Sequence, residues 1–120
     1  MTRPRVYSYP ACSTCRKALA WLRERDIAVE VIDITREPPS TEELAGALLQ
    51  LGRARLFNTS GQSYRALGAA VVKSLTDDQA IAALAADGKL IKRPFLVLPD
   101  GRSLTGFAVQ EWQGLLDPLP

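Results

Sequence analysis

Two short apolar runs flank the first amphipathic stretch of the chain. Residues 5–9 form an apolar and aromatic run, and residues 27–34 alternate β-branched side chains with others. Between them, residues 16–25 repeat apolar side chains at the three- and four-residue spacing of a helix. We therefore predict a strand, a helix and a second strand, a unit that favours parallel strands with a right-handed crossover.

The middle of the chain carries signals for helices. The tetrapeptides that begin at Ser40 and at Thr76 are capping boxes, in which a hydroxyl side chain is followed three residues later by Glu or Gln. A further short helix is predicted over residues 62–67, whereas residues 53–61 are expected to be irregular or extended. We therefore expect a helical insertion over about residues 40–90.

The final third of the chain returns to an extended pattern. Residues 94–98 and 102–106 flank a Pro-Asp-Gly turn at residues 99–101, which predicts a β-hairpin. Residues 108–116 can then form a closing helix, with Trp112 facing inward. The order β-α-β, helices, β-β-α is that of an α/β fold with a thioredoxin-like mixed sheet.

Composition narrows the class of protein further. The chain has 120 residues, 47% of them hydrophobic, which fits a single domain over residues 1–120. The net charge of +2, from 15 basic and 13 acidic side chains, is too balanced to imply direct binding of nucleic acid. No apolar run approaches the roughly 20 residues of a membrane span, and no signal-peptide pattern is visible. We expect a cytoplasmic protein with no membrane partner.

The candidate chemistry lies in a C-x-x-C motif at the start of the first predicted helix. A helix N-terminus gathers unpaired N–H groups and partial positive charge, which stabilise a thiolate at Cys12. Cys15 lies three residues on, on the same face and close enough for a disulfide after modest adjustment. Arg16 adds a fixed positive charge next to them. We predict Cys12 as nucleophile, Cys15 as resolving thiol and Arg16 as the third catalytic residue.

Two other uses of the cysteines remain open at this point. The pair could be half of a zinc site, or two ordinary core residues. A zinc site would need carboxylate ligands, because the chain has only two cysteines and no histidine. A structural disulfide across three residues would constrain little of the unfolded chain. Redox chemistry is therefore the preferred interpretation, with no metal or organic cofactor.

Four stretches of the sequence resemble the arsenate reductase/Spx family of thioredoxin-fold proteins, and they occur in the family's order. They are residues 9–18, residues 56–61 with Tyr64, residues 90–94, and Gly106-Phe107 with Glu111-Trp112. The resemblance covers nearly the whole chain. It implies a thioredoxin fold and a redox-active disulfide.

The resemblance to the glutaredoxin-coupled arsenate reductases implies a substrate site. Cys12 matches the active cysteine of these enzymes, and Arg93 matches the arginine before the family's proline, here Pro94. Asn58 and Gly106 stand where two further anion-binding arginines would be. We therefore expect Arg93, Asn58 and Pro94 to bind substrate, a small oxyanion being one candidate, and we expect a cis bond before Pro94. An external thiol reductant, such as glutathione with glutaredoxin, or thioredoxin, would recycle the disulfide.

The resemblance to the Spx-type regulators implies a second function. These regulators keep the C-x-x-C as a redox switch and bind the C-terminal domain of the RNA polymerase α-subunit. The present chain shares their run from Cys12 to Ala18. The sequence thus predicts a thiol–disulfide oxidoreductase of arsenate-reductase type, and a redox-switched transcriptional regulator is the alternative.

Overall fold

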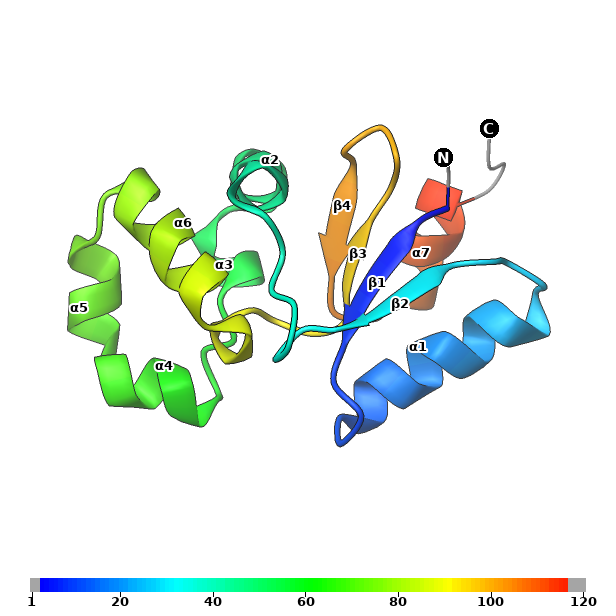
Figure 1. Cartoon of the computed structure of the whole chain (residues 1–120), viewed down its shortest axis with the longest axis horizontal. Coiled ribbons are helices and arrows are strands. Elements are labelled where there is room, and N and C mark those ends of the chain that lie inside the picture. The colour runs from blue at the N-terminus through cyan, green and yellow to red at the C-terminus, as the bar shows by residue number, and fades with distance from the viewer. Residues whose placement is uncertain (1–2, 117–120) are drawn as a thin grey trace.

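Within residues 3–116, which the computed structural model describes, four strands form one mixed sheet in the order β2-β1-β3-β4 (Figure 1). The inner strand β1 (Arg5–Ser8) runs parallel to β2 (Glu30–Asp33) and antiparallel to β3 (Phe95–Val97). β3 in turn pairs antiparallel with β4 (Ser103–Thr105). This sheet confirms the predicted thioredoxin-like arrangement, a parallel unit followed by a hairpin.

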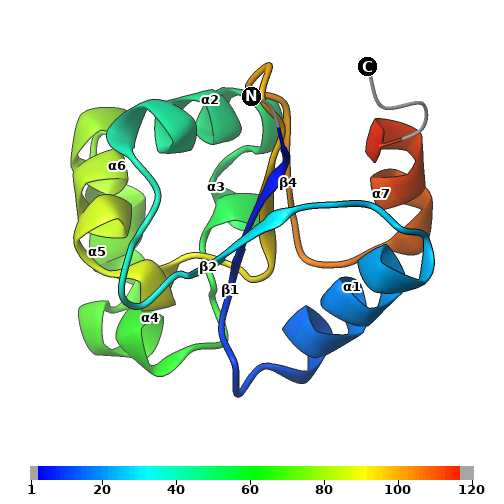
Figure 2. The ribbon, with the colours of Figure 1, turned by 45° about the vertical axis from the view of Figure 1, so that its right-hand side comes forward.

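Helices cover both faces of the sheet (Figure 2). α1 (Ser13–Glu24) and α7 (Val109–Leu116) lie on one side, and the helices from the middle of the chain lie on the other. Side chains alternate along β1, so Val6 packs into the core beneath α1 and α7, whereas Tyr7 packs into the core on the opposite face. Trp112 is fully buried in the first of these cores, as the sequence predicts.

The middle of the chain is a run of helices, and both predicted capping boxes, at Ser40 and Thr76, are formed. The helices are α2 (Thr41–Leu51), α3 (Arg53–Leu56), α4 (Gln62–Leu67), α5 (Ala69–Ser74), α6 (Asp77–Ala86) and the 3-10 helix η1 (Gly88–Leu90). They occupy the region of the predicted insertion, while the assignment of one domain to the whole chain stays a prediction. In the described part of the chain, no helix has both the length and the apolar character needed to cross a membrane.

Polar contacts fix this helical region to the sheet. The amide of Gln50 accepts a hydrogen bond from the N–H of Ser103 and donates one to the carbonyl of Gly101, each at 2.9 Å, so it covers the outer edge of β4. On the face of the sheet, the hydroxyl of Tyr7 donates to Glu43 Oε1 at 2.8 Å. These contacts hold α2 against the sheet whose inner strand leads to the cysteines.

The second strand is shorter than predicted. The prediction placed it at residues 27–34, but β2 covers only four of these residues. Asp26 has a positive φ of 55°, and the N–H of Ile27 closes the end of α1 by donating to the carbonyl of Leu22 at 3.0 Å. The alternating pattern therefore begins while the chain is still turning away from the helix, and pairing with β1 starts only at Glu30.

The prediction that residues 53–61 are irregular or extended is only partly right. The segment begins with the helix α3. Only Phe57 has strand character there, in an isolated antiparallel bridge to Ile91. The helix α5 was also missed. It follows Gly68 without a side-chain cap, so the local sequence lacks the usual signal for a helix start.

We predict that Gly88→Ala will destabilise the fold by about 1–3 kcal/mol or more, in the range of overpacked cores. Gly88 is buried, and a Cβ there would overlap the backbone carbonyl of Ile34, which cannot move aside as a flexible side chain could. The measurement is the free energy of unfolding in urea. Gly114→Ala is the matched control, since a Cβ at this position in α7 meets nothing within 4 Å. That variant should gain about 0.5–1 kcal/mol. Equal stabilities for the two variants would contradict the close approach at Gly88.

Candidate functional site

Cys12 occupies the N-cap of α1, where its sulfur takes the place of the usual cap oxygen. Its backbone is extended, with φ −89° and ψ 117°, and its Sγ accepts a hydrogen bond from the N–H of Cys15 at 3.4 Å. The N–H of Cys12 donates to the carbonyl of Tyr9 at 3.0 Å, which closes the turn between β1 and the helix. The sulfur therefore faces the unpaired N–H groups at the start of the helix.

These surroundings decide the ionisation of Cys12. Partial burial raises the pKa of the thiol, and it is the largest single effect. Hydrogen bonds from Cys15 and from the N–H of Thr14, together with the positive charge of Arg93, lower the pKa and outweigh burial. The pKa of Cys12 therefore lies below its ordinary value, at a partly exposed position.

Cys15 has the opposite character. Its side chain is only 1% exposed, and its Sγ accepts a hydrogen bond from the N–H of Tyr9 at 3.4 Å. Burial raises the pKa of Cys15 to about 12, and the hydrogen bond with Cys12 and the charge of Cys12 act in the same direction. The motif therefore combines a partly exposed thiol of lowered pKa with a buried thiol of raised pKa.

Arg93 and Pro94 lie beside this loop, at the start of β3. The bond between them is cis, as predicted. Backbone hydrogen bonds fix this segment on both sides. The N–H of Lys92 donates to the carbonyl of Leu56 at 2.9 Å, and the N–H of Gly106 donates to the carbonyl of Pro94 at 2.9 Å. Arg93 extends its guanidinium over the ring of Tyr9, with Cζ 5.1 Å from the ring centroid.

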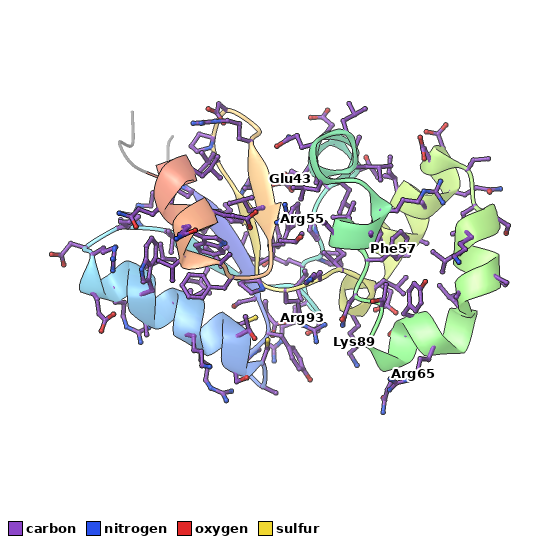
Figure 3. The ribbon with its side chains drawn as sticks, turned by 180° about the vertical axis from the view of Figure 1, so that it is seen from behind. Glu43, Arg55, Phe57, Arg65, Lys89 and Arg93 are labelled. Carbon is purple, nitrogen blue, oxygen red and sulfur yellow. The ribbon has the colours of Figure 1, made fainter. Side chains whose placement is uncertain are left out.

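A pocket of about 250 Å³ opens next to Arg93. It is lined by Tyr9, Asn58, Gly61, Gln62, Ser63, Lys89 and Arg93. Figure 3 shows Arg93 and Lys89 on the same side of the molecule, Arg93 nearer to the sheet and Lys89 nearer to α4. The fold thus brings together two of the predicted substrate residues, Asn58 and Arg93, and adds a second cation. The roles of both residues in binding substrate stay predictions.

Sequence reasoning did not assign five of the lining residues to a substrate site, namely Tyr9, Gly61, Gln62, Ser63 and Lys89. Gln62 and Ser63 begin α4 directly after the Asn-Thr-Ser-Gly run, so their closeness to Asn58 was the signal available. Lys89 lies in η1, where the carboxylate of Asp87 accepts a hydrogen bond from its N–H at 3.0 Å. Nothing local marks Lys89 as a pocket residue, since its position depends on how η1 packs beside α4.

Arg16 is placed differently from its predicted role at the thiolate. Its side chain is exposed, and its guanidinium donates to the carbonyl of Pro10 at 2.8 Å. Arg16 therefore braces the turn that carries Cys12, whereas Arg93 is the cation that lowers the pKa of Cys12. A catalytic role for Arg16 stays a prediction. Among residues 3–116, no group of three His, Cys, Asp or Glu side chains could hold a metal ion.

Comparisons with known proteins agree with this arrangement. A crystal structure described as a possible arsenate reductase from Streptococcus mutans superposes with a TM-score of 0.84 at 39% identity, over 94% of this chain and 99% of that one. The uncharacterized protein YusI of Bacillus subtilis is 40% identical over 111 residues, which are 89% of this chain and 92% of YusI.

Two further relatives have named functions. The arsenate reductase of Neisseria meningitidis is 30% identical over 119 residues, which are 97% of this chain and all of that protein. The regulatory protein MgsR of Bacillus subtilis is 32% identical over 93 residues, which are 76% of this chain and 73% of MgsR. Residues 7–115 match the ArsC family as a whole. The chain therefore belongs to the ArsC family.

Proposed function

We propose that this protein is a thiol–disulfide oxidoreductase of arsenate-reductase type, with Cys12 as nucleophile and Cys15 as resolving thiol. The observation that carries the proposal is the contrast between the two sulfurs. Cys12 is partly exposed with a lowered pKa, while Cys15 is buried beside it with a pKa of about 12. The arsenate reductases among the relatives support this class of reaction.

The reaction then proceeds in two exchanges. The Cys12 thiolate attacks one sulfur of an oxidised substrate, forms a mixed disulfide and releases the other sulfur as a thiolate, which takes a proton from water. Cys15 next gives its proton to water and attacks Sγ of Cys12, which expels the remaining substrate sulfur as a thiolate and leaves a disulfide between Cys12 and Cys15. The expelled thiolate takes up a proton from water, so the protons balance. An external thiol reductant, such as glutathione with glutaredoxin, or thioredoxin, supplies two electrons to restore both thiols. We place the reaction in the cytoplasm, where such reductants keep thiols reduced.

The order of these steps follows from the electrostatics of the pair. Burial is the main cause of the raised pKa of Cys15, and the negative charge of the Cys12 thiolate raises it further, so Cys15 stays protonated while Cys12 is free to attack. Once Cys12 is bound in a neutral mixed disulfide, that charge is gone and Cys15 loses its proton more readily. The first exchange therefore activates the second.

A redox-switched regulator remains the second candidate, because MgsR is among the relatives. In that function the disulfide would change the affinity for a protein, the C-terminal domain of the RNA polymerase α-subunit, rather than complete a turnover. The pocket favours the enzyme. A surface that docks a protein has no need of a concave site with two cations and side-chain amides, whereas a small substrate does.

The function is tested by trapping the mixed disulfide. With bis(2-hydroxyethyl) disulfide, Cys15→Ser should accumulate an adduct of one mercaptoethanol on Cys12, because the resolving thiol is missing. The wild-type protein should instead end with an internal disulfide. Mass spectrometry of the intact protein and of its peptides measures both products. An adduct in Cys12→Ser, or none in Cys15→Ser, would refute the assigned roles.

The rate of alkylation should follow the ionisation of Cys12. We expect a midpoint below the value of about 8.5 for free cysteine, so the rate rises with pH through that lower midpoint and then levels off. Arg93→Ala should move the midpoint to higher pH, because it removes a charge that lowers the pKa. Iodoacetamide labelling across a pH series measures this. Arg25→Ala, which lies at the other end of α1, is the control and should leave the midpoint in place. An unshifted midpoint in Arg93→Ala would contradict the electrostatic role of Arg93.

Arsenate turnover should be weak in the wild-type protein and stronger in Asn58→Arg. Each charge-assisted hydrogen bond to an anion contributes about 1.5–3 kcal/mol, or one to two orders of magnitude in affinity. Asn58 lines the pocket with Arg93, whereas Gly106 has a φ of +71° that would strain an arginine there. A coupled arsenate reductase assay gives the KM of each variant. Thr59→Arg adds the same charge at an exposed neighbouring residue outside the pocket lining, and it should change little. Strong turnover by the wild type would show that another group supplies the missing charge.

A further inference from the structure

Tyr9 contacts three parts of the site at once. Its N–H donates to Sγ of Cys15 at 3.4 Å, and its carbonyl accepts from the N–H of Cys12 at 3.0 Å. Its ring forms a wall of the pocket and lies beneath the guanidinium of Arg93. The backbone of Tyr9 is thus tied to the cysteines, while its side chain is tied to the cation.

Arg93 needs such a support, because other contacts that could fix its side chain are scarce. Among the ion pairs and side-chain hydrogen bonds within residues 3–116, none involves Arg93. The side chain of Arg93 is partly exposed and has many rotamers. Without a fixed contact, its positive charge would be distributed over several positions. A guanidinium stacks on an aromatic face, and the flat group loses little further freedom there.

The ring also places the charge where the reaction needs it. Tyr9 and Arg93 both line the pocket, and Tyr9 is bonded through its backbone to the residue that carries the reactive sulfur. A guanidinium resting on this ring therefore lines the pocket and also lies close enough to Cys12 to lower the pKa of its thiol. If it left the ring, the same side chain could extend into solvent, and both the pocket and the thiolate would lose a positive charge.

We propose that Tyr9 is a positioning residue, whose ring holds the guanidinium of Arg93 beside Cys12 and the pocket. Tyr9 acts on the reaction through Arg93 and not by contact with the reacting atoms. The role rests on the proposed function, since it concerns the attack of Cys12 on a disulfide. The ring is what matters, so the hydroxyl of Tyr9 is dispensable.

The test compares two disulfide probes that Cys12 cleaves in the same way, each releasing one thiolate. One is the dianion 5,5′-dithiobis(2-nitrobenzoate), and the other is the neutral 4,4′-dithiodipyridine. Tyr9→Leu should slow the reaction with the dianion about two- to fivefold more than the reaction with the neutral probe, the range that a partly exposed cation–π contact provides. Tyr9→Phe should retain the wild-type ratio of the two rates.

The link through Arg93 is tested by a double-mutant cycle. In an Arg93→Ala background, Tyr9→Leu should cause no further change in the ratio of rates or in the alkylation midpoint of Cys12. Arg93→Lys, which keeps the charge but lacks the flat guanidinium, should lie between the wild type and Arg93→Ala. Arg25→Ala is the matched control, because it removes the cation of the other cation–π contact, with Trp21, far from the pocket.

Two results would overturn the proposal. Tyr9→Leu could slow the reaction with both probes equally, and do so in the Arg93→Ala background as well. That result would show that Tyr9 supports the loop without acting through Arg93. A loss in Tyr9→Phe equal to that in Tyr9→Leu would assign the effect to the hydroxyl. If Tyr9→Leu unfolds at a clearly lower urea concentration than the wild type, its rates are set aside. The ratio of the two probe rates in Tyr9→Phe, compared with that in Arg93→Lys, then decides between ring and hydroxyl. A wild-type protein in which Cys12 cleaves neither probe would refute the proposed function itself, while the alkylation midpoints would still test the Tyr9–Arg93 link.

Discussion

The hydrogen bond from the N–H of Cys15 to Sγ of Cys12 is the contact on which the site depends. It exists because α1 begins at the residue after Cys12, so that the sulfur caps the helix. The start of α1 is in turn fixed by packing, since Ala18 and Leu22 bury one face of the helix against the sheet. The cap contact is weak by itself. Its position is nevertheless determined by a hydrophobic core that cannot shift without breaking many other contacts.

The same turn gives two adjacent sulfurs different chemistry because the helix exposes one and buries the other. Cys12 lies at the helix end, where N–H groups face it, while Cys15 lies three residues on, where the helix meets the sheet. Tyr9 holds both through its backbone. Deeper burial raises the pKa of Cys15, whereas hydrogen bonds at the helix end lower that of Cys12, so a change at the core face of α1 would reach the chemistry through Cys15.

Much of this could be predicted from the sequence, because it depends on local patterns. The N-cap position of Cys12, the capping boxes at Ser40 and Thr76, and the hairpin all follow from a few consecutive residues. The charge acting on Cys12 could not be assigned in this way. Arg16 is its neighbour in sequence but bonds to the carbonyl of Pro10, whereas Arg93 approaches only after β3 pairs with β1. The helix α5 and the pocket residue Lys89 were missed for the same reason, since packing rather than a cap or a motif determines them.

The distribution of charge around Cys12 bears on what the protein can bind. A small oxyanion attacked at Cys12 would need several donors around the sulfur, yet two positions that the resemblance assigns to anion-binding arginines hold Asn58 and Gly106. The cations Arg93 and Lys89 line a pocket of about 250 Å³ that also includes Gln62 and Ser63 of α4 but neither cysteine. The sheet and α1 thus position the Cys12 thiol, while the helical region contributes Asn58, Gln62, Ser63 and Lys89 to the pocket beside Arg93.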